Sequence, residues 1–586
     1  MCGIAGLVMR DGSTPSVEIL DRFARVLGHR GPDGEGKHLA GPVGMVMTRL
    51  AIIDLLTGDQ PIYDPGGVAL IANAEIYNFV ELRAQLRFDT FTTQSDCELP
   101  LHLYRRNGLS FADDLRGMYA IAIHDPVEGR LVLARDSFGI KPLYYVEKPD
   151  LFAFASEPSA LIAAGIVEAV ENLDHRDELL QLQFTCGRNT IYKDICRVLP
   201  GETLEIRGAQ IVSRRLRPSL PTPIPTEISQ DTALVRINDA LIDSVEKHQR
   251  SDVPYGLFLS GGTDSATILA LMARQTDRPL QTFTAGFSER GVHDERLHAR
   301  QLAKSVGAEH HEVEFTEEDF WSLLPQIAGC MDDPAADYAI SPTWKLAREA
   351  AQELKVVLSG EGGDELFAGY GRYRSILRPV WQGGRAIRPQ GIFDRLRVLR
   401  HENNAWRDGI SSAEATAAIH GRTKLQIAQA TDIADWLPND LLTKLDRCLM
   451  SHGLEGRTPL LDPIVVDAVF SLPDQFKVRN GQGKWILRQW LAENFAASRP
   501  FEKKRGFTVP VGEWMSHHSD RLGELIAKDP AVEAVCHPSR IKALFSSTKK
   551  RARFAGWTLL FYALWHRRNI RNLPADGDTF ECLAAR

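Results

Sequence analysis

The stretch YGLFLSGGTDSATILALMARQ, residues 255–275, decides the fold of the larger part of this chain. Its apolar start is typical of a buried strand, its centre SGGTDS is a glycine-rich turn, and its end has the pattern of a helix. Such a turn can bind phosphate, because Gly261 and Gly262 let the main chain approach an anion that the helix N-terminus attracts. The hydroxyls of Ser260 and Ser265 can donate hydrogen bonds to the same anion.

Strand and helix patterns continue to alternate around this stretch. Apolar strands are expected at LQTFTAGF (280–287) and KVVLS (355–359), and helices at 231–247, 265–275, 295–306 and 341–353. This alternation predicts parallel βαβ units and therefore a doubly wound parallel sheet. After KVVLS the chain enters a second glycine-rich loop, which is also acidic. Two such loops at strand ends can face one crevice.

The first part of the chain has a different pattern. Short runs of β-branched and aromatic residues, such as VALIANAEIYNF and GMYAIAIHD, are broken by Gly, Pro and Asp, which predicts a sheet-rich domain. Four prolines between residues 214 and 230 exclude a helix interior or a central strand there. We therefore expect a first domain at 2–213, an extended Pro-rich connector at 214–230, and a second domain at 231–586.

Composition excludes several classes of function. The 586 residues carry a net charge of −7, from 69 Lys plus Arg and 76 Asp plus Glu, with no long block of like charge. Binding to nucleic acid or to anionic lipid is therefore not expected. The eight cysteines form no CxxC pair, which argues against a zinc module or a disulfide framework. No secretory signal and no run of ~20 apolar residues is evident, so we expect a cytoplasmic protein without a membrane segment.

Cys2 follows only the initiator Met. If that Met is removed, the chain begins with a thiol beside its own α-amine, whose pKa is near ~7.7 to 8. Such an amine can take the thiol proton at neutral pH, and one residue then supplies both nucleophile and base. A cysteine at position 2 without further context would be no evidence of catalysis.

The context is a set of motifs that occur in one order: MCGIAG, HRGPD, RLAIID, NAEIYN, SDCE and RDSFGIKPLYY. Together they resemble the glutamine amidotransferases with an N-terminal cysteine nucleophile, which implies an Ntn-hydrolase-like αββα sandwich. By this resemblance Cys2 attacks the amide of glutamine, forms a glutamyl thioester and releases ammonia. The resemblance also implies a glutamine-binding set with Asn73 and the Ala74 N–H as oxyanion hole: Arg49 for the α-carboxylate, Ile52, Asn73, Ala74, and Glu75 and Asp96 for the α-amino group.

Two residues depart from the pattern of that family. Glycine is usual where Ala74 stands and again where Gln94 precedes Ser95. A main-chain donor survives the change to alanine unless the backbone needs a positive φ, in which case Ala74 is strained. In that case ammonia release would be slow.

SGGTDS lacks the GK[ST] ending of a Walker loop, so a kinase-like γ-phosphoryl transfer is the poorer interpretation. It resembles the pyrophosphatase loop (PP-loop) of enzymes that cleave ATP to AMP and pyrophosphate. The resemblance implies that Asp264 and Asp364 ligate Mg²⁺, a cation that prefers oxygen ligands. It implies roles for Glu361 with the acyl-adenylate and for Lys484 with the developing charge, although a lone helical lysine is normally solvated. The implied ATP-binding residues are Leu259, Ser260, Gly261, Gly262, Asp264, Ser265, Ala285, Ser359 and Gly360.

Together the two parts resemble the glutamine-hydrolysing asparagine synthetase family over nearly the whole chain. The implied reaction converts aspartate and ATP to β-aspartyl-AMP, which glutamine-derived ammonia then attacks. The same chemistry on another carboxylate, in a peptide, a natural-product precursor or a saccharide, stays open. A ring-closing enzyme that needs no ammonia is disfavoured by the intact Cys2 and by Glu361, where the β-lactam branch tends to have Tyr.

Two further alternatives are a silent binding protein and a plain glutaminase. Both are disfavoured because Asp264, Asp364 and Lys484 are all present. The expected ligands are small molecules: glutamine, ATP with Mg²⁺, and aspartate or another carboxylate. A homodimer is the candidate assembly.

Overall fold

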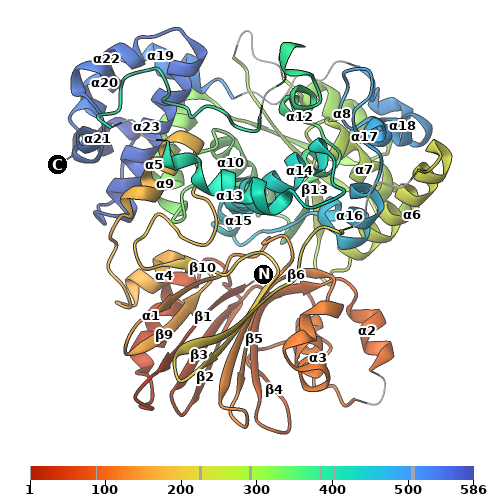
Figure 1. Cartoon of the computed structure of the whole chain (residues 1–586). Helices are drawn as coiled ribbons and strands as arrows, with labels where there is room; N and C mark the ends of the chain where they lie inside the picture. The colour runs from red at the N-terminus through yellow and green to blue at the C-terminus, as the bar shows by residue number, and fades with distance from the viewer. Residues whose placement is uncertain are drawn as a thin grey trace.

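The computed structural model describes residues 2–86, 89–222, 227–276, 278–289, 294–382, 384, 386–401, 404–502 and 509–585. Figure 1 shows two parts: a pair of sheets in the lower half and a helix-rich body in the upper half. The lower part comes from the beginning of the chain, as the sheet-rich pattern predicts. Each of the eight cysteines is free.

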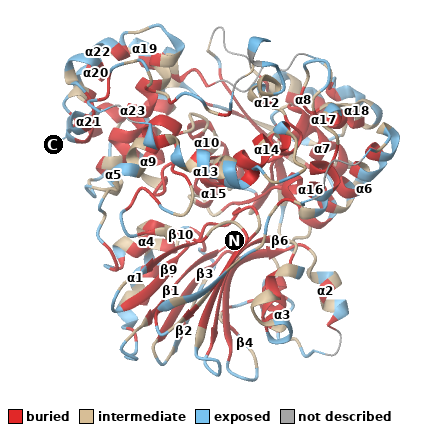
Figure 2. Ribbon diagram, viewed as in Figure 1, coloured by how far each residue is buried: buried red, intermediate tan, exposed pale blue. Residues whose placement is uncertain are grey.

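The lower part is a four-layer αββα sandwich, which confirms the predicted fold. One antiparallel sheet has the order β10-β8-β9-β1-β3-β2, and the other has the order β12-β11-β7-β6-β5-β4. The strands are β1 (Cys2–Met9), β2 (Gly34–Ala40), β3 (Val43–Arg49), β4 (Ile62–Tyr63), β5 (Ala69–Ile76), β6 (Gly117–Asp125), β7 (Arg130–Arg135), β8 (Tyr144–Glu147), β9 (Leu151–Ala155), β10 (Cys196–Arg197), β11 (Glu202–Arg207) and β12 (Gln210–Leu216). β1 and β5 are buried along nearly their whole length, since each is covered on both faces (Figure 2).

Three apolar layers hold the sandwich together. Side chains such as Ile4 and Ile71 fill the space between the sheets. Phe23 of α1 packs on the outside of the first sheet, and Phe111 on the outside of the second. The covering helices are α1 (Val17–Leu27) and α4 (Pro158–Ala163) on one side, and α2 (Phe79–Gln85), η1 (Asp96–Glu98), α3 (Leu99–Asn107) and η2 (Gly108–Asp114) on the other.

Helix α5 (Leu173–Leu182) leaves this sandwich and lies in the upper part, in contact with η4 (Ala405–Arg407) and α23 (Lys550–Asn569) (Figure 1). The residues at its end hold it there. Gln181 Oε1 accepts from the main-chain N of Phe393 at 2.9 Å, and Gln183 Nε2 donates to the carbonyl of Ala336 at 2.8 Å. A segment from the first part of the chain is thus packed into the second.

The upper part contains a five-stranded parallel sheet with the order β15-β14-β13-β16-β17. Its strands are β13 (Tyr255–Phe258), β14 (Gln281–Gly286), β15 (Glu309–Glu314), β16 (Val356–Leu358) and β17 (Glu455–Arg457). The chain runs outward on one side from β13 and returns to its other side at β16, so the sheet has a switch point between β13 and β16. Ligands bind at such points in open α/β sheets.

Helices cover both faces of this sheet, which confirms the doubly wound architecture. Leu241 of α6 and Ile268 of α7 pack on one face, and Ala347 of α10 and Leu445 of α15 pack on the other. The helices of the upper part are α6 (Gln230–His248), α7 (Thr263–Gln275), α8 (Arg296–Ser305), α9 (Glu317–Cys330), α10 (Ile340–Ala350), α11 (Gly363–Leu366), α12 (Gly371–Ile376), α13 (Asp408–Ala417), α14 (Lys424–Thr431), the π-helical η5 (Asp432–Leu442), α15 (Thr443–Met450), α16 (Pro463–Phe470), α17 (Asp474–Lys477), α18 (Trp485–Asn494), α19 (Val511–His517), α20 (Ser519–Ala527), α21 (Pro530–Val535), α22 (Pro538–Phe545), α23 (Lys550–Asn569) and α24 (Thr579–Ala584). Short 3-10 turns are η3 (Val380–Gln382), η4 (Ala405–Arg407), η6 (Pro459–Leu461) and η7 (Ala496–Ser498).

The connector expected at 214–230 overlaps the end of β12 and the first residue of α6. Strand β12 runs to Leu216 at the edge of its sheet, and α6 starts at Gln230. Pro223 and Pro225, on which the extended connector was partly argued, lie outside the described residues. Within the described residues, every helix is too short or too polar to cross a membrane.

Candidate active sites

Cys2 lies at the start of β1, in the middle of the first sheet, where it pairs with Arg49 of β3. The side chain is buried, and its main-chain N donates to Asn73 Oδ1 at 3.0 Å. Burial raises the pKa of the Cys2 thiol, while a main-chain hydrogen bond from Leu50 and the guanidinium of Arg49 act to lower it. A thiol with a raised pKa needs a base to become a nucleophile.

Asn73 reaches Cys2 from β5 of the other sheet, and Ala74 follows it in the same strand. Asn73 Nδ2 is buried and has no hydrogen-bond partner among the described residues. Ala74 lies in a regular strand opposite Tyr119, with a φ that is not positive. The alanine that stands in place of glycine is therefore unstrained. Gln94 is the second residue that differs from the family pattern. Its side-chain Oε1 accepts a hydrogen bond from Arg83 Nη1 at 2.7 Å.

The loop after β3 wraps around the guanidinium of Arg49. Nη2 donates to the carbonyl of Asp54 at 2.5 Å, and Nη1 donates to Asp59 Oδ1 at 2.8 Å. The Asp59 side chain is 83% exposed, so this second contact lies at the surface. Ile52, at the beginning of the same loop, is buried.

Glu75 and Asp96 are both buried near Cys2, and burial raises the pKa of each carboxyl. Asp96 Oδ2 accepts from the main-chain N of Ile76 at 2.7 Å. Glu75 Oε2 lies 2.8 Å from Nη2 of Arg457, a residue of β17 in the upper part. Arg49 and Asn73 thus lie next to Cys2, Glu75 and Asp96 lie close by, and Glu75 is paired with Arg457, which sequence reasoning missed.

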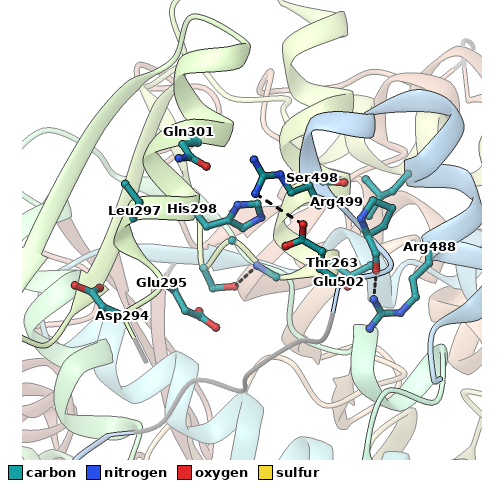
Figure 3. A pocket seen from close by; sticks show the side chains of 15 residues that line it. Thr263, Asp294, Glu295, Leu297, His298, Gln301, Arg488, Ser498, Arg499 and Glu502 are labelled. Atoms are coloured by element: carbon teal, nitrogen blue, oxygen red, sulfur yellow. Dashed lines mark hydrogen bonds and ion pairs between the residues drawn. The ribbon is translucent and has the colours of Figure 1, made fainter. Parts of the chain in front are cut away.

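The second site is a cavity of about 330 Å³ at the switch point of the parallel sheet. Both glycine-rich loops contribute to it, as predicted from their positions after strands. Nine predicted residues line it: Leu259, Ser260, Asp264, Ser265, Ala285, Ser359, Gly360, Glu361 and Asp364. Gly261 and Gly262 line an adjoining cavity of about 410 Å³ together with Ser260. Figure 3 shows this adjoining cavity, with Thr263, His298 and Arg488 around it.

The geometry of SGGTDS explains why Gly261 is a glycine. Gly261 has φ +69°, and a Cβ there would lie 3.1 Å from His298 Cδ2. The hydroxyl oxygens of Ser260 and Ser265 are 3.1 Å apart, and the N–H of Gly262 donates to Ser260 Oγ at 3.3 Å. Gly360 of the other loop is equally confined, because a Cβ there would lie 2.8 Å from Asp264 Cβ. The two loops therefore touch.

Lys484 connects these loops to α18. It precedes the helix in a left-handed conformation, φ +58°, and its side chain is 2% exposed. Its Nζ lies 2.5 Å from Asp264 Oδ2 and 2.6 Å from Asp364 Oδ1. Burial lowers the pKa of Lys484, but the two carboxylates outweigh burial and raise it to about 12. A non-glycine residue in this conformation is strained, and such strain is concentrated at functional sites.

Lys444 is a further residue that sequence reasoning missed. It lies on α15, is buried, and its Nζ is 3.5 Å from Glu361 Oε1 and 3.3 Å from Asp337 Oδ2. It belongs to the segment LTKLDRC, where a lysine on a helix gives no sign of burial. Lys444 and Glu361 both line the cavity of about 330 Å³.

Buried ion pairs join the two sites. Arg30, of the HRGPD motif, is fully buried, and its Nε donates to the Cys2 carbonyl at 3.3 Å. Its Nη1 lies 2.8 Å from Glu157 Oε1 and 2.8 Å from Asp446 Oδ2, and Asp446 is part of α15. One layer of buried charges thus connects Cys2 with α15, the helix that carries Lys444 to the cavity of about 330 Å³.

An αββα sandwich that begins with cysteine, joined to a parallel sheet with a phosphate-binding turn at its switch point, defines a glutamine amidotransferase fused to an ATP-dependent ligase. The family model "Glutamine amidotransferase domain" matches residues 1–216, and the model "Asparagine synthase" matches residues 236–567. The chain belongs to the asparagine synthase family.

Two relatives match almost end to end. A Bacillus subtilis protein named asparagine synthetase [glutamine-hydrolyzing] 1 is 32% identical, over 98% of this chain and 98% of its own length. A Mycobacterium tuberculosis protein named putative asparagine synthetase [glutamine-hydrolyzing] is also 32% identical, over 97% of each chain. This similarity covers both candidate sites.

Proposed function

We propose that this chain converts aspartate to asparagine with glutamine as nitrogen donor and ATP as activator. ATP adenylates the β-carboxylate to β-aspartyl-AMP with loss of pyrophosphate, and ammonia then displaces AMP. The observation that carries this proposal is the buried Lys484, held between Asp264 and Asp364 where two glycine-rich loops meet. A cation between two loop carboxylates suits the binding of a polyphosphate and of the charge that leaves with it.

At the glutamine end, removal of Met1 frees the α-amine of Cys2. Cys2 then attacks the side-chain amide once this amine has taken the thiol proton. The amine then gives a proton to the departing ammonia, and water cleaves the glutamyl thioester. Asn73 Nδ2, which has no hydrogen-bond partner among the described residues, and the N–H of Ala74 stabilise the oxyanion. Arg49 binds the α-carboxylate of glutamine, which replaces the exposed Asp59. Asp96 and Glu75 bind the α-ammonium group, and Ile52 packs beside it.

At the ATP end, Leu259, Ala285, Ser359 and Gly360 surround the nucleoside, and the turn SGGTDS binds the phosphates. Asp264 and Asp364 are suited to Mg²⁺: they are oxygen donors that face each other across one ammonium group, and Asp264 Oδ1 has no hydrogen-bond partner among the described residues. Bound there, Mg²⁺ would neutralise phosphate charge. Lys484 stabilises the negative charge that develops on pyrophosphate.

At the acceptor end, Glu361 and Lys444 form an ion pair in the cavity of about 330 Å³, which we call the nucleotide cavity. We infer that Lys444 orients the reacting carboxylate and that Glu361 positions the acyl-adenylate for ammonia. The same chemistry on a larger carboxylate is a second candidate. It is supported by a further cavity of about 410 Å³ that shares Asp337 and Tyr370 with the nucleotide cavity.

The decisive experiment measures pyrophosphate release from ATP and Mg²⁺, with ammonium as nitrogen source, in the presence and absence of aspartate. Release that depends strongly on aspartate supports asparagine synthesis. If pyrophosphate release depends on a different carboxylate, that carboxylate and not aspartate is the substrate. The absence of release with every carboxylate would contradict the ATP chemistry as a whole.

A further inference from the structure

A loop of the first part of the chain encloses the guanidinium of Arg49. We call this segment, residues 50–61 between β3 and β4, the Arg49 loop. The carbonyls of Asp54 and Ile53 accept hydrogen bonds from Arg49 Nη2 at 2.5 and 3.4 Å. The conformation of the Arg49 loop therefore sets the direction in which this guanidinium points.

Asp54 has an unfavourable backbone conformation within the Arg49 loop. Its φ is +56°, in the left-handed region. A non-glycine residue keeps such a conformation only where its surroundings fix it, although Asp tolerates it better than most residues. The side chain is fixed from the first part of the chain: Oδ1 accepts from Thr57 N at 2.9 Å, and Oδ2 accepts from Gln94 N at 2.8 Å. The main-chain N of Asp54 has its partner in the upper part.

That partner is Asp252, which lies just before β13. Asp252 Oδ2 accepts from the main-chain N of Asp54 at 2.8 Å. In return, the main-chain N of Asp252 donates to the carbonyl of Ile52 at 3.1 Å. Two reciprocal hydrogen bonds thus hold the Arg49 loop against the upper part, and one of them acts on the residue whose carbonyl contacts Arg49.

A second polar contact reaches the Arg49 loop from the start of β16. Asp33 Oδ2 accepts from the main-chain N of Ala51 at 2.8 Å and from Lys355 Nζ at 2.7 Å. Lys355 is the residue before β16, which pairs with β13 in the parallel sheet. This contact is less direct than that of Asp252, because Lys355 reaches the loop only through Asp33.

Apolar side chains also join the Arg49 loop to the upper part. Leu50 and Ile52 belong to one buried cluster with Val356 and Met450, and Tyr255 packs against this cluster. Tyr255 and Val356 are the first residues of β13 and β16, and at their other ends both strands lead into the glycine-rich loops of the nucleotide cavity. The Arg49 loop is therefore packed on the amino ends of the two strands whose carboxyl ends carry that cavity.

We propose that Asp252 is a positioning residue for glutamine: it holds Asp54 in the conformation whose carbonyl directs Arg49 toward the α-carboxylate of glutamine. Lys355 assists through Asp33. The glutamine site of the first part is then complete only when the upper part is packed against it. This inference rests on the proposed function, in which Arg49 binds that carboxylate.

The test measures glutamate formation by the full chain over a range of glutamine concentrations. Asp252→Ala removes the acceptor for the Asp54 N–H and keeps the main-chain hydrogen bond to Ile52. We expect the KM for glutamine to rise about three- to tenfold, the effect of one lost hydrogen bond, while kcat stays within about twofold of the parent chain. A weaker hold on glutamine raises KM, whereas a smaller folded fraction lowers kcat and leaves KM unchanged.

Three further variants define the contact. Asp252→Asn keeps an acceptor oxygen, so its KM should stay within about twofold of that of the parent chain. Lys355→Met should raise KM less than Asp252→Ala does, because its contact is indirect. Asp394→Ala is the matched control and should leave KM unchanged, since Asp394 also accepts a main-chain N–H, from Gly391 at 3.0 Å, but within the upper part.

The ammonium-dependent reaction is an internal check on the same preparation. Pyrophosphate release by Asp252→Ala should stay within about twofold of the parent chain, because Asp252 does not line the nucleotide cavity. Equal losses in both reactions would mean that Asp252 acts on folding, and they would overturn the positioning role.

The inference is also overturned if Asp252→Ala leaves KM unchanged, if Asp252→Asn raises KM as much as Asp252→Ala does, or if Asp394→Ala has the same effect. Arg49→Met, measured in parallel, separates this failure from that of the proposed function. A large rise in KM or no detectable glutamate with Arg49→Met, but an unchanged KM with Asp252→Ala, would refute the positioning role alone. An unchanged KM with Arg49→Met would refute the proposed binding of the α-carboxylate, and the positioning role with it.

Discussion

The pair of contacts made by Lys484 gives a prediction that can be worked out from distances. Its Nζ lies 2.5 Å from Asp264 Oδ2 and 2.6 Å from Asp364 Oδ1, so these two oxygens are at most about 5 Å apart. Replacing Lys484 by Met keeps a long apolar side chain and removes the positive charge. Two carboxylates then face each other in a buried site without the cation that separates them.

The magnitude follows from Coulomb's law. Two unit charges about 5 Å apart repel by roughly 3 kcal/mol at an effective dielectric constant near 20. A lost contact to transition-state charge is typically worth ~2.7 to 4 kcal/mol, or 10²–10³ in rate. We therefore expect Lys484→Met to lower the rate of pyrophosphate release about 10²-fold or more.

The assay compares two activities of the same preparation. Pyrophosphate release with ATP, Mg²⁺ and ammonium should fall, while glutamate formation from glutamine should stay within about twofold of the parent chain, since the thiol end does not use this lysine. Lys477→Met is the control. Lys477 is equally buried and donates to the carbonyl of Phe470 at 2.7 Å, but it lines neither the nucleotide cavity nor the cavity around Gly261 and Gly262.

Normal pyrophosphate release by Lys484→Met would refute the role given to this lysine. Equal losses of both activities, accompanied by a lower melting temperature, would mean that the residue acts on folding alone. A similar loss of pyrophosphate release in Lys477→Met would show that removing any buried lysine lowers the rate, whether or not the lysine contacts Asp264 and Asp364. The interpretation survives only if the two lysines differ.

Cys2→Ala should abolish glutamine-dependent synthesis and leave ammonium-dependent synthesis intact, as measured by product formation with each nitrogen source; loss of both would make Cys2 structural. Arg30→Met should lower the free energy of unfolding by about 3 to 5 kcal/mol in denaturant titrations, because the buried carboxylates of Glu157 and Asp446 then keep only one guanidinium, that of Arg447, as an ion-pair partner in this cluster; a change below about 1 kcal/mol would contradict this. Burial raises the pKa of Asp440 to about 7, so the native state keeps a proton that the unfolded state loses near pH 4, and stability falls as pH rises from 4 to 7. Asp440→Asn without ligand should therefore melt higher than the parent chain at pH 8, by the equivalent of at least about 1.4 kcal/mol, and the gap should close at pH 4; a gap that is the same at both pH values would contradict this.

Local patterns were sufficient for much of the fold. The apolar runs at 255–258 and 356–358 and the helix at 230–248 were predicted because their burial periodicity is visible in the sequence. Strands β15 and β17 were not predicted. EHHEVE at the sheet edge is polar, and EGR is too short and too charged to give a strand pattern. Their positions depend on neighbours in the sheet and not on their own side chains.

Part of each candidate site could also be predicted from the sequence, and part could not. The glycine-rich loops and Cys2 were found from their order along the chain. The ion pairs Glu75–Arg457 and Glu361–Lys444 could not be predicted from the sequence, because each joins segments that are far apart along the chain. The sequence around a buried lysine or arginine does not distinguish it from a solvated one. Only the tertiary structure reveals which charges have lost their water.

Because α5 packs into the upper part, the two parts of the chain are interleaved and not merely joined one after the other. Cutting the peptide bond after Leu216 would sever the connector, yet α5 would remain clamped by Phe393 and Ala336 from the other fragment. The fragments should then co-elute as a nicked complex until denaturant is added. For the same reason the second fragment, expressed without the first, would lack Gln181, Leu182 and Gln183, which line the cavity of about 410 Å³ beside Asp337 and Tyr370. We therefore expect that neither part of the chain can be separated from the other without loss of packing contacts.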